Sequence, residues 1–368
     1  MKLSCDAAEL AAALAVVSRA LAARTTLPVL GMVRLEANYD RLLLEATNLE
    51  LGIRKPVRAE IAEGGAIAVP GRLLTEFTSA IGEERLDLEL HTPGFRLLLR
   101  TASYETEIQG IDPEEFPPAP TADGGEQVTL PADRLVDAIA DTLAAASTDE
   151  ARPVLTGVRL SAANHRLTLT ATDGYRLAER TVAADRGGKL RATVPARTMV
   201  EVARLFRSAQ GDVEVILAQQ GNQVFFRGSE GEVSSRVIDG GYPNTGRLIP
   251  SAWTTRASVD AAELNRRLRA LFPFAQQSAN VVRLTVGSGA VGLSAAATDV
   301  GSARTPLDAD VSGPEMAFAF NARYLLDCLG SAEDQIDLEL QGPLAPAVVR
   351  RPATGDYVYL FMPVRYPL

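Results

Sequence analysis

With 368 residues, 46% of them hydrophobic and 23% charged, the chain has the composition of a globular protein that is too long for a single core, so two or three domains are expected. The net charge of −9 argues by itself against non-specific nucleic-acid binding, although the basic residues are nearly all arginine, as either a phosphate-binding face or a biased genome would produce. The two cysteines and two histidines are scattered, which disfavours a metal site, and no apolar run approaches the roughly 20 residues of a membrane helix, which favours a cytoplasmic protein.

The first predicted element is an amphipathic helix over Asp6–Arg19, whose apolar residues recur with a period near 3.6. Asp6 and Glu9 interrupt the apolar N-terminal stretch, which therefore lacks the unbroken apolar block expected of a signal peptide. Two alternating strands joined by a polar turn follow in VRLEANYDRLLLEAT (33–47), and a further strand comes after them. A second helix opens at VPGR (69–72), and the strands of RLDLELHTPGFRLLLRTA (85–102) close the unit. The Pro- and acid-rich segment 111–127 is predicted to be a linker.

This order of elements is repeated twice. LPVLGMVRLEANYDRLLLEATNLELGIRKPV begins at Leu27, and RPVLTGVRLSAANHRLTLTATDGYRLAERTV begins at Arg152, a spacing of 152 − 27 = 125 residues. A third, more divergent copy begins at Ala279 with ANVVRLTVGSGAVGLSAAATDVGSARTPL. Further helices are predicted over 132–146, 195–208 and 260–272 and from FNAR (320–323), with a second linker over 239–252. The chain is therefore predicted to be α+β, with three tandem domains at 1–120, 128–245 and 251–368, which favours a curved or closed assembly.

Arginines gather on the predicted solvent faces of these helices. Arg197 lies opposite the apolar stripe of one helix, and Arg266 and Arg269 lie opposite that of another. A helix of about 14 residues is about 21 Å long, and duplex DNA carries one charge per ~1.7 Å of its axis, so such arginines would follow phosphates without reading bases. A solvated helix face is polar in any case, and the helix over 132–146 presents aspartates there, so the alternative of an ordinary solvated surface stays open.

One polar motif occurs in all three repeats, and its middle copy, ATDGYRLAER (171–180), carries the most polar side chains. Its counterparts are ATNLELGIRK from Ala46 and ATDVGSARTP from Ala297. An enzyme with a triplicated scaffold would use Asp173 with Glu179 for acid–base chemistry, but no nucleophile, metal set or phosphate loop accompanies them. The simpler interpretation is an Asp-Gly turn followed by a strand that begins at Tyr-Arg-Leu. We therefore predict no catalytic residue, no metal and no cofactor.

The three-fold unit, RPVLTGVRL, TATDGYRLAER, the loop DGGYPN (239–244) and the tail YLFMPVR (359–365) together resemble the bacterial DNA polymerase III beta subunit family, the sliding clamps, over the entire chain. The resemblance implies clamp domains with helices inside and antiparallel sheets outside, which form half of a closed ring. It implies a head-to-tail homodimer that encircles duplex DNA without sequence specificity, in the cytoplasm on the nucleoid. It also implies a non-catalytic processivity factor that tethers the replicative DNA polymerase subunit and other polymerases and repair proteins, and that a clamp loader opens.

The resemblance further implies a pocket between the second and third domains that binds short linear peptides. The matching positions are Arg152, Leu155, Thr172, Gly174, Tyr175, Arg176, Leu177, Pro243, Arg247, Leu248, Asn321, Tyr324, Met362, Pro363, Val364 and Arg365. Leucines and methionine would form an apolar floor, and Arg176 and Arg365 would donate to peptide carbonyls. The family usually ends one residue after MPxR, whereas this chain continues to Tyr366, Pro367 and Leu368, which leaves the details of the pocket open.

Two further sets of residues follow from the resemblance and the helix faces. The DNA-binding candidates are Arg24, Arg72, Arg197, Arg266 and Arg269. The candidates for the contact between two copies are Tyr104 and Ile108 in the first domain and Leu271, Phe272 and Phe274 in the third. LFPFAQ (271–276) ends a predicted helix and would equally serve packing within its own domain. The rival function is a triplicated protein-binding scaffold that does not encircle DNA.

Overall fold

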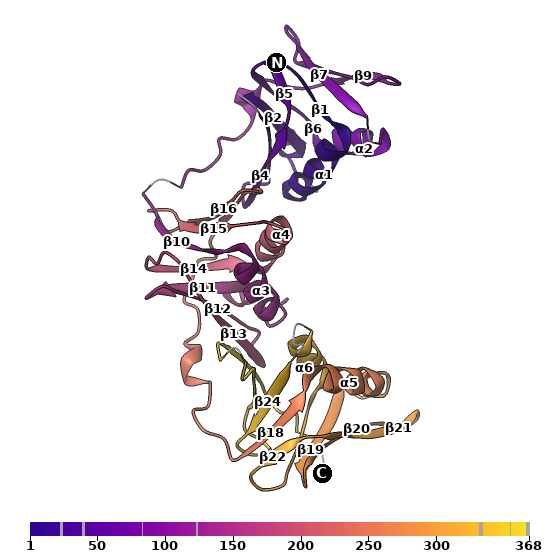
Figure 1. Cartoon of the computed structure of the whole chain (residues 1–368), viewed down its shortest axis with the longest axis vertical. Coiled ribbons are helices and arrows are strands. Elements are labelled where there is room, and N and C mark those ends of the chain that lie inside the picture. The colour runs from indigo at the N-terminus through magenta and orange to yellow at the C-terminus, as the bar shows by residue number, and fades with distance from the viewer. Residues whose placement is uncertain are drawn as a thin grey trace. The chain divides into compact units, whose positions relative to one another are not determined.

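The computed structural model describes residues 1–22, 25–38, 41–82, 84–122, 124–330, 334–353 and 355–365 (Figure 1). The chain divides into two compact units, and each is described by itself. The first contains residues 1–133, 188–190 and 200–237, and the second contains residues 134–187, 191–199 and 238–368. The division runs through the second sequence repeat, so each unit holds one whole terminal repeat and part of the central one.

The first unit starts with a short strand and a helix. Strand β1 (Lys2–Asp6) leads directly into α1 (Ala7–Val17), and the Asp6 carboxylate accepts a hydrogen bond from the Glu9 backbone N–H at 2.9 Å, which caps the helix. The predicted helix is confirmed, although a 3-10 turn, η1 (Ser18–Ala20), replaces its last residues. Helix α2 (Gly71–Ala80) packs beside α1, as Figure 1 shows.

The strands of the first unit form two antiparallel sheets. The five-stranded sheet has the order β5-β1-β7-β8-β9, and the eight-stranded sheet has the order β10-β15-β16-β17-β4-β3-β2-β6. Besides β1, the bounds are β2 (Met32–Asn38), β3 (Arg41–Thr47), β4 (Leu51–Arg58), β5 (Glu60–Glu63), β6 (Gly65–Pro70), β7 (Arg85–His91), β8 (Arg96–Arg100), β9 (Glu105–Gln109), β10 (Glu126–Pro131), β15 (Asp212–Leu217), β16 (Gln223–Gly228) and β17 (Gly231–Arg236). Short 3-10 turns, η2 (Pro28–Gly31) and η3 (Pro113–Glu115), lie in the loops.

The second unit has a nine-stranded antiparallel sheet of order β14-β11-β12-β13-β26-β25-β24-β18-β22 and a four-stranded sheet of order β21-β20-β19-β23. Its strands are β11 (Gly157–Ala163), β12 (Arg166–Thr172), β13 (Arg176–Ala183), β14 (Leu190–Pro195), β18 (Thr255–Asp260), β19 (Val281–Gly287), β20 (Ala290–Ala297), β21 (Gly301–Asp308), β22 (Asp310–Ser312), β23 (Met316–Asn321), β24 (Gln335–Leu340), β25 (Ala347–Arg350) and β26 (Tyr357–Phe361). Its 3-10 turns are η4 (Pro153–Thr156) and η5 (Thr245–Arg247).

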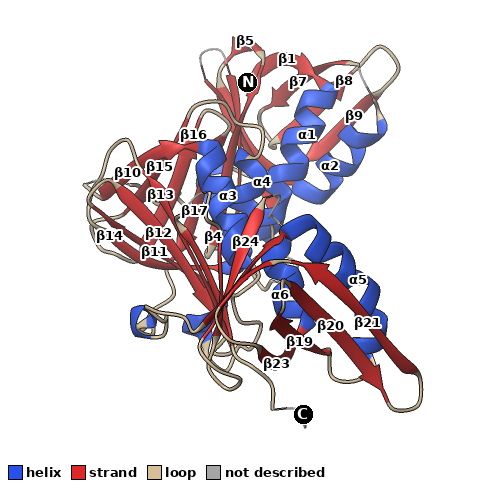
Figure 2. Ribbon diagram, turned by 60° about the horizontal axis from the view of Figure 1, so that its bottom comes forward, coloured by secondary structure: helices blue, strands red, loops and turns tan. Residues whose placement is uncertain are grey.

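Helices α5 (Ala261–Gln276) and α6 (Ala322–Leu329) belong to the second unit, and Figure 2 shows α5 beside β20 and β21. Helices α3 (Ala132–Leu143) and α4 (Ala196–Phe206) have residues in both units. Among the described residues, no helix combines the length and apolar character that crossing a membrane requires.

The predicted α+β class with antiparallel sheets is confirmed, but two details of the prediction are wrong. The helix predicted over 260–272 is longer than expected, because α5 continues through Pro273 to Gln276, so LFPFAQ does end a helix as predicted. Proline removes one helical hydrogen bond, and the buried Leu271 and Ala275 hold the last turn against the core in spite of that loss. In addition, strands β1, β10 and β18 precede the first helix of each repeat, and at five or six residues each they gave too short a pattern to be separated from the helix that follows.

Both cysteines lie in the core. Cys5 lies two residues after Leu3 on β1, and Cys328 lies on α6, where the Tyr357 hydroxyl donates to its Sγ at 3.5 Å. Burial is the largest cause of the raised pKa of both thiols, which reaches about 12 for each. Both thiols are therefore neutral at ordinary pH and are poor nucleophiles.

We predict that neither thiol of the native protein reacts with iodoacetamide at about pH 8, whereas both react after unfolding in concentrated urea. Because the folded pKa is raised, the free-energy contribution of each buried thiol is complete below the unfolded value of 9.0 and is lost as the pH rises toward about 12. Mass spectrometry of the alkylated protein measures the first effect, and urea unfolding at increasing alkaline pH measures the second. Rapid alkylation of Cys328 in the folded chain would contradict this description of the core.

Candidate functional site

The motif ATDGYRL forms a tight turn between β12 and β13. The Thr172 hydroxyl donates to the Arg176 carbonyl at 2.6 Å and accepts from the Gly174 N–H at 3.1 Å. One carboxylate oxygen of Asp173 accepts from the N–H groups of Tyr175 and Arg176 at 2.9 and 3.0 Å. Gly174 has φ +93°, which favours glycine there. The turn is thus held by its own side chains and leaves Tyr175 66% exposed.

The C-terminal tail lies directly beside this turn. Strand β13 pairs with β26 so that Leu177 lies opposite Leu360, and the Met362 N–H donates to the Tyr175 carbonyl at 2.8 Å. Leu177, Leu360 and Val348 form a buried apolar cluster. Strand pairing therefore brings together two motifs that are almost 190 residues apart, and it sets an apolar floor beneath them.

Arg176 joins the second and third repeats through its side chain. Its Nε lies 2.9 Å from Asp173, and one terminal nitrogen lies 2.5 Å from Asp327 on α6 and 3.4 Å from the Tyr359 hydroxyl. Its guanidinium also lies 4.7 Å from the ring centroid of Tyr324. Burial by itself would lower the pKa of Arg176, but Tyr359, Asp327 and Asp173 outweigh that effect and raise the pKa above its ordinary value.

Sequence reasoning missed two partners of this arginine. Asp327 lies four residues after Arg323, a spacing that favours a pair within helix α6, whereas the structure pairs Asp327 with Arg176. Tyr359 is part of the tail motif but was given no role. It lies two residues from Phe361, and side chains at that spacing share one face of a strand, which was a usable signal for its position.

The remaining residues predicted for the pocket all lie in the second unit, with different exposure. The Tyr242 hydroxyl donates to the Thr170 carbonyl at 3.2 Å, and Ile249 packs on the apolar cluster, so both ends of the segment carrying Pro243, Arg247 and Leu248 are attached to this region. Asn321 caps α6 by accepting from the Arg323 N–H, and the Val364 N–H donates to the Ala319 carbonyl. Exposed members are Arg152, Gly174, Tyr175, Pro243, Arg247, Leu248, Met362 and Arg365; half-buried members are Arg176, Asn321, Tyr324, Pro363 and Val364; buried members are Leu155, Thr172 and Leu177. Tyr366, Pro367 and Leu368 lie outside the described residues.

The four described DNA-binding candidates are exposed on helices. They are Arg72 on α2, Arg197 on α4, and Arg266 and Arg269 on α5. Arg266 makes a forked pair with Glu263 at 2.7 to 3.0 Å, and this hydrogen bonding lowers the pKa of Glu263. Arg269 donates to Asn265 at 2.9 Å. A phosphate that approached Arg266 would therefore share it with a carboxylate. Arg24 lies outside the described residues.

The candidates for a contact between copies differ in exposure. Tyr104 is 50% exposed and packs edge-on against Phe77, with ring centroids 6.5 Å apart, whereas Ile108 is buried. Phe272 and Phe274 are half-buried, and Leu271 is buried in the core. Sequence reasoning missed Val300, which is 62% exposed, and nothing in the local pattern distinguished it.

The acid–base pair considered for an enzyme has other partners. Asp173 holds the turn and Arg176, and Glu179 accepts from the Thr170 hydroxyl at 3.3 Å. Within the described parts of the chain, no group of three or more His, Cys, Asp or Glu side chains is placed to hold a metal ion.

Comparison with known proteins covers almost the full length. Family models match the N-terminal domain of the DNA polymerase III beta subunit at residues 1–120, its central domain at 129–244 and its C-terminal domain at 246–365. The beta sliding clamp of Synechococcus elongatus is 32% identical over 373 residues, which cover 99% of each chain. The crystal structure of the sliding clamp of Bacillus subtilis is similar with a TM-score of 0.92 at 26% identity, and that of Pseudomonas aeruginosa bound to griselimycin with 0.93 at 25%; both comparisons cover 100% of each chain.

We predict that Asp327→Ala lowers the stability of the chain by about 1 kcal/mol, because a half-buried guanidinium loses one charged partner and keeps another. Asp327→Asn should cost less, since its amide oxygen still accepts from Arg176. The midpoint of urea unfolding measures both variants, with Asp299→Ala, at an exposed aspartate in a loop, as the matched control. Equal midpoints for the Asp327→Ala and Asp299→Ala variants would show that Asp327 does not stabilise the junction.

Proposed function

Because this chain belongs to the DNA polymerase III beta subunit family, the non-catalytic beta sliding clamps, we propose that two copies of it join head to tail in a ring that encircles duplex DNA without sequence specificity. The helices of the three repeats face the DNA and the sheets form the outside. The ring works in the cytoplasm on nucleoid DNA, where a clamp loader opens it and the replicative polymerase is its main partner. It acts by raising the effective concentration of its partners at the primer end.

The exposed arginines on α2, α4 and α5 support a DNA-facing role for the helices. Arg72, Arg197, Arg266 and Arg269 offer dispersed positive charge in a chain whose net charge is −9. The forked pair between Arg266 and Glu263 fits this role, because an arginine already held by a carboxylate contacts phosphate weakly. Weak and exchangeable contacts allow a ring to slide.

The edges of two sheets support the head-to-tail contact. Strand β9 ends the five-stranded sheet, and β21 ends the four-stranded sheet. Pairing β9 of one copy with β21 of another would satisfy both open edges. Tyr104 near β9, and Phe274 and Val300 near β21, would supply the apolar contact, with Ile108 and Leu271 supporting it from beneath.

One observation carries the proposed partner-binding groove: Tyr175, Leu248 and Met362 are exposed around a floor that strand pairing has already made apolar. Exposed apolar side chains beside a preformed floor bind an extended peptide through its apolar anchors. Arg176, held by Asp173 and Asp327, would fix the polar end of that peptide, and Arg365 lies at the tail end of the groove. Through this groove the clamp would bind the replicative polymerase, the clamp loader, other polymerases and repair proteins.

Analytical ultracentrifugation tests the head-to-tail contact. The chain has a mass of 39.2 kDa, so the proposed dimer has a mass of 2 × 39.2 = 78.4 kDa. Phe274→Asp should shift the protein toward 39.2 kDa, because a carboxylate would be buried without a partner at the contact. Asp308→Ala, on the exposed face of β21, is the control and should stay dimeric. A wild-type chain that sediments as a monomer at all accessible concentrations would contradict the ring.

Primer extension by the cognate replicative polymerase tests the groove. Met362→Ala should weaken tethering by about tenfold, because it removes an apolar anchor worth about 1.4 kcal/mol. Leu27→Ala, which truncates an exposed apolar residue of the first unit, is the control and should leave processivity unchanged. If both variants behave alike, partners do not use the groove. If partners bind but the protein is never retained on DNA, the chain acts as a protein-binding scaffold instead.

A further inference from the structure

Each unit contains one place where consecutive repeats share a sheet, and the two places have the same register. In the first unit β4 pairs with β17, and in the second unit β13 pairs with β26. The corresponding pairs are Leu51↔Ser235 and Arg176↔Phe361, then Gly52↔Ser234 and Leu177↔Leu360, then Ile53↔Val233 and Ala178↔Tyr359. One hydrogen bond beyond each ladder also corresponds: Arg236 N–H to the Glu50 carbonyl and Met362 N–H to the Tyr175 carbonyl, both at 2.8 Å.

The turns that precede β4 and β13 correspond as well. Thr47 accepts from the Leu49 N–H at 3.0 Å, and Asn48 accepts from the N–H groups of Glu50 and Leu51 at 3.0 and 2.8 Å. These are the bonds that Thr172 and Asp173 make in the second unit. The backbone of the first junction therefore reproduces the backbone around the proposed groove.

The floors of the two junctions differ. Where the second unit has Leu177 opposite Leu360, the first has Gly52 opposite Ser234. A Cβ atom on Gly52 would lie 2.6 Å from the Ser234 hydroxyl oxygen, so a larger residue does not fit without a shift. Gly52 and Ser234 are part of the lining of a hollow beside the shared strands.

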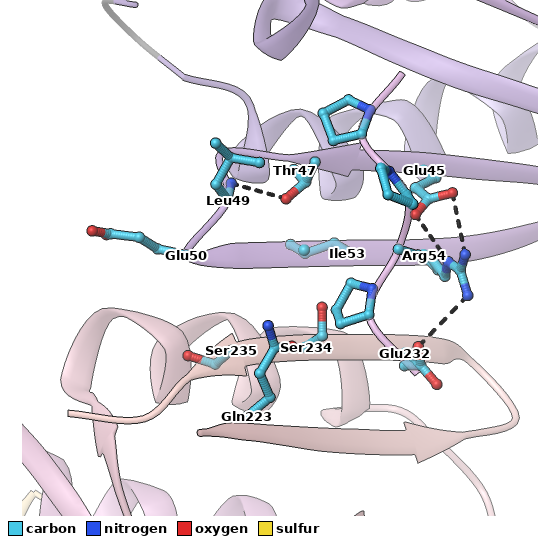
Figure 3. Close-up of a pocket in the computed structure, with 15 residues that line it drawn as sticks. Glu45, Thr47, Leu49, Glu50, Ile53, Arg54, Gln223, Glu232, Ser234 and Ser235 are labelled. Carbon is cyan, nitrogen blue, oxygen red and sulfur yellow. Dashed lines mark hydrogen bonds and ion pairs between the residues drawn. The ribbon is translucent and has the colours of Figure 1, made fainter. Parts of the chain in front are cut away.

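This hollow has a volume of about 150 Å³, room for several water molecules or one side chain (Figure 3). Its neutral polar residues are Thr47, Gln223, Ser234 and Ser235, and Glu45, Glu50, Arg54 and Glu232 line it as well. The linker between the first two repeats supplies an apolar wall, made of Pro117, Pro118, Ala119 and Pro120. The lining thus combines neutral polar and charged groups with an apolar side, unlike the leucine floor of the second unit.

Three of the four charged residues that line the hollow, Glu45, Arg54 and Glu232, are joined by ion pairs through Arg54. Arg54 lies 3.1 Å from Glu45 and 3.9 Å from Glu232, and Figure 3 shows these pairs together, away from Glu50. Arg34 and Arg227 pair with the same two glutamates from outside the hollow. A neutral hydrogen-bonding group therefore fits the hollow better than an ion does.

Leu49 marks the rim of the hollow. It takes the position of Gly174 with φ +72°, a conformation that is unfavourable for leucine, and its side chain is 50% exposed. Local geometry and solvation both disfavour leucine here. Covering its side chain by a ligand would compensate for the exposure.

We propose that this hollow is a second peptide-binding site, which takes an extended segment of a partner protein with a neutral amide or hydroxyl side chain seated among Gln223, Ser234 and Ser235 and an apolar neighbour on Leu49. The proposal rests on the proposed function for the class of occupant. The first unit repeats the backbone register that surrounds the proposed peptide groove of the second unit, so we infer the same class of occupant. The chemistry differs, because this floor selects hydrogen-bonding side chains where the other selects aliphatic ones.

Methyl NMR of the full-length protein, with labelled isoleucine and methionine, tests the proposal. The Ile53 methyl reports on the hollow, and the Met362 methyl reports on the groove of the second unit. The probes are acetyl-Leu-Gln-Leu-amide and acetyl-Leu-Leu-Leu-amide. The glutamine probe should shift the Ile53 resonance at a concentration about fivefold or more below the one that the all-leucine probe requires.

Two variants make the assignment specific. Ser234→Ala removes one hydrogen-bonding group, and Leu49→Gly removes the rim anchor while relieving the positive φ, so it should not lower stability. Each should weaken the Ile53 response to the glutamine probe by about fivefold and leave the Met362 response unchanged. Ser251→Ala, at an exposed serine far along the chain, is the matched control and should change neither.

The outcomes separate the two sites. An Ile53 resonance that neither probe shifts, or a shift that survives both variants, would overturn the second site. A Met362 resonance that no probe moves, while Ile53 responds and the two variants weaken that response, would refute the groove of the second unit and support the hollow.

Discussion

Strand pairing between consecutive repeats is the constraint on which the proposed functional surfaces depend. In the second unit the pairing of β13 with β26 places the turn that precedes β13 beside the C-terminal tail, and it puts Leu177 opposite Leu360 in one buried cluster. Side chains alternate between the two faces of a strand, so a slip of one residue would turn Leu177 away from that cluster and expose the wrong residues. The cluster is thus a product of register, and residues far apart in the sequence form it only because the sheet continues from one repeat to the next.

The same backbone carries different chemistry in the two units. Leucines cover the shared strands in the second unit, and Arg176 closes one end through contacts to two carboxylates and a tyrosine hydroxyl. In the first unit glycine and serine replace the leucines, and Arg54 forms the ion pairs. Repetition of the fold provides equivalent backbone surroundings in the two units, and on our proposal substitution at a few floor and rim positions decides what each site binds. The middle copy of the polar motif is the copy that contributes Leu177 to the apolar cluster.

Patterns of residue spacing within one segment predicted the helices and turns that form within that segment. The repeats, the amphipathic helices and the turn at Asp173 follow from residue spacing and turn chemistry, and the structure contains them. The continuation of α5 through Pro273 depends on the burial of Leu271 and Ala275, which outweighs the preference of proline to end a helix. The contact of Asp327 with Arg176 joins two repeats, so the helical spacing to Arg323 favoured the wrong partner. Periodicity also cannot separate an edge residue such as Tyr104 from a buried one such as Ile108, because their exposure depends on which neighbouring strand is present.

The central claim is that the protein holds DNA by enclosing it, and retention on circular DNA measures this most directly. The protein is loaded onto nicked plasmid with a clamp loader and ATP, the plasmid is cut, and gel filtration follows the protein before and after cutting. The account predicts that the protein elutes with the circle and dissociates once the DNA has ends. Retention that cutting does not change and that only salt abolishes would mean ordinary electrostatic binding and would contradict the ring.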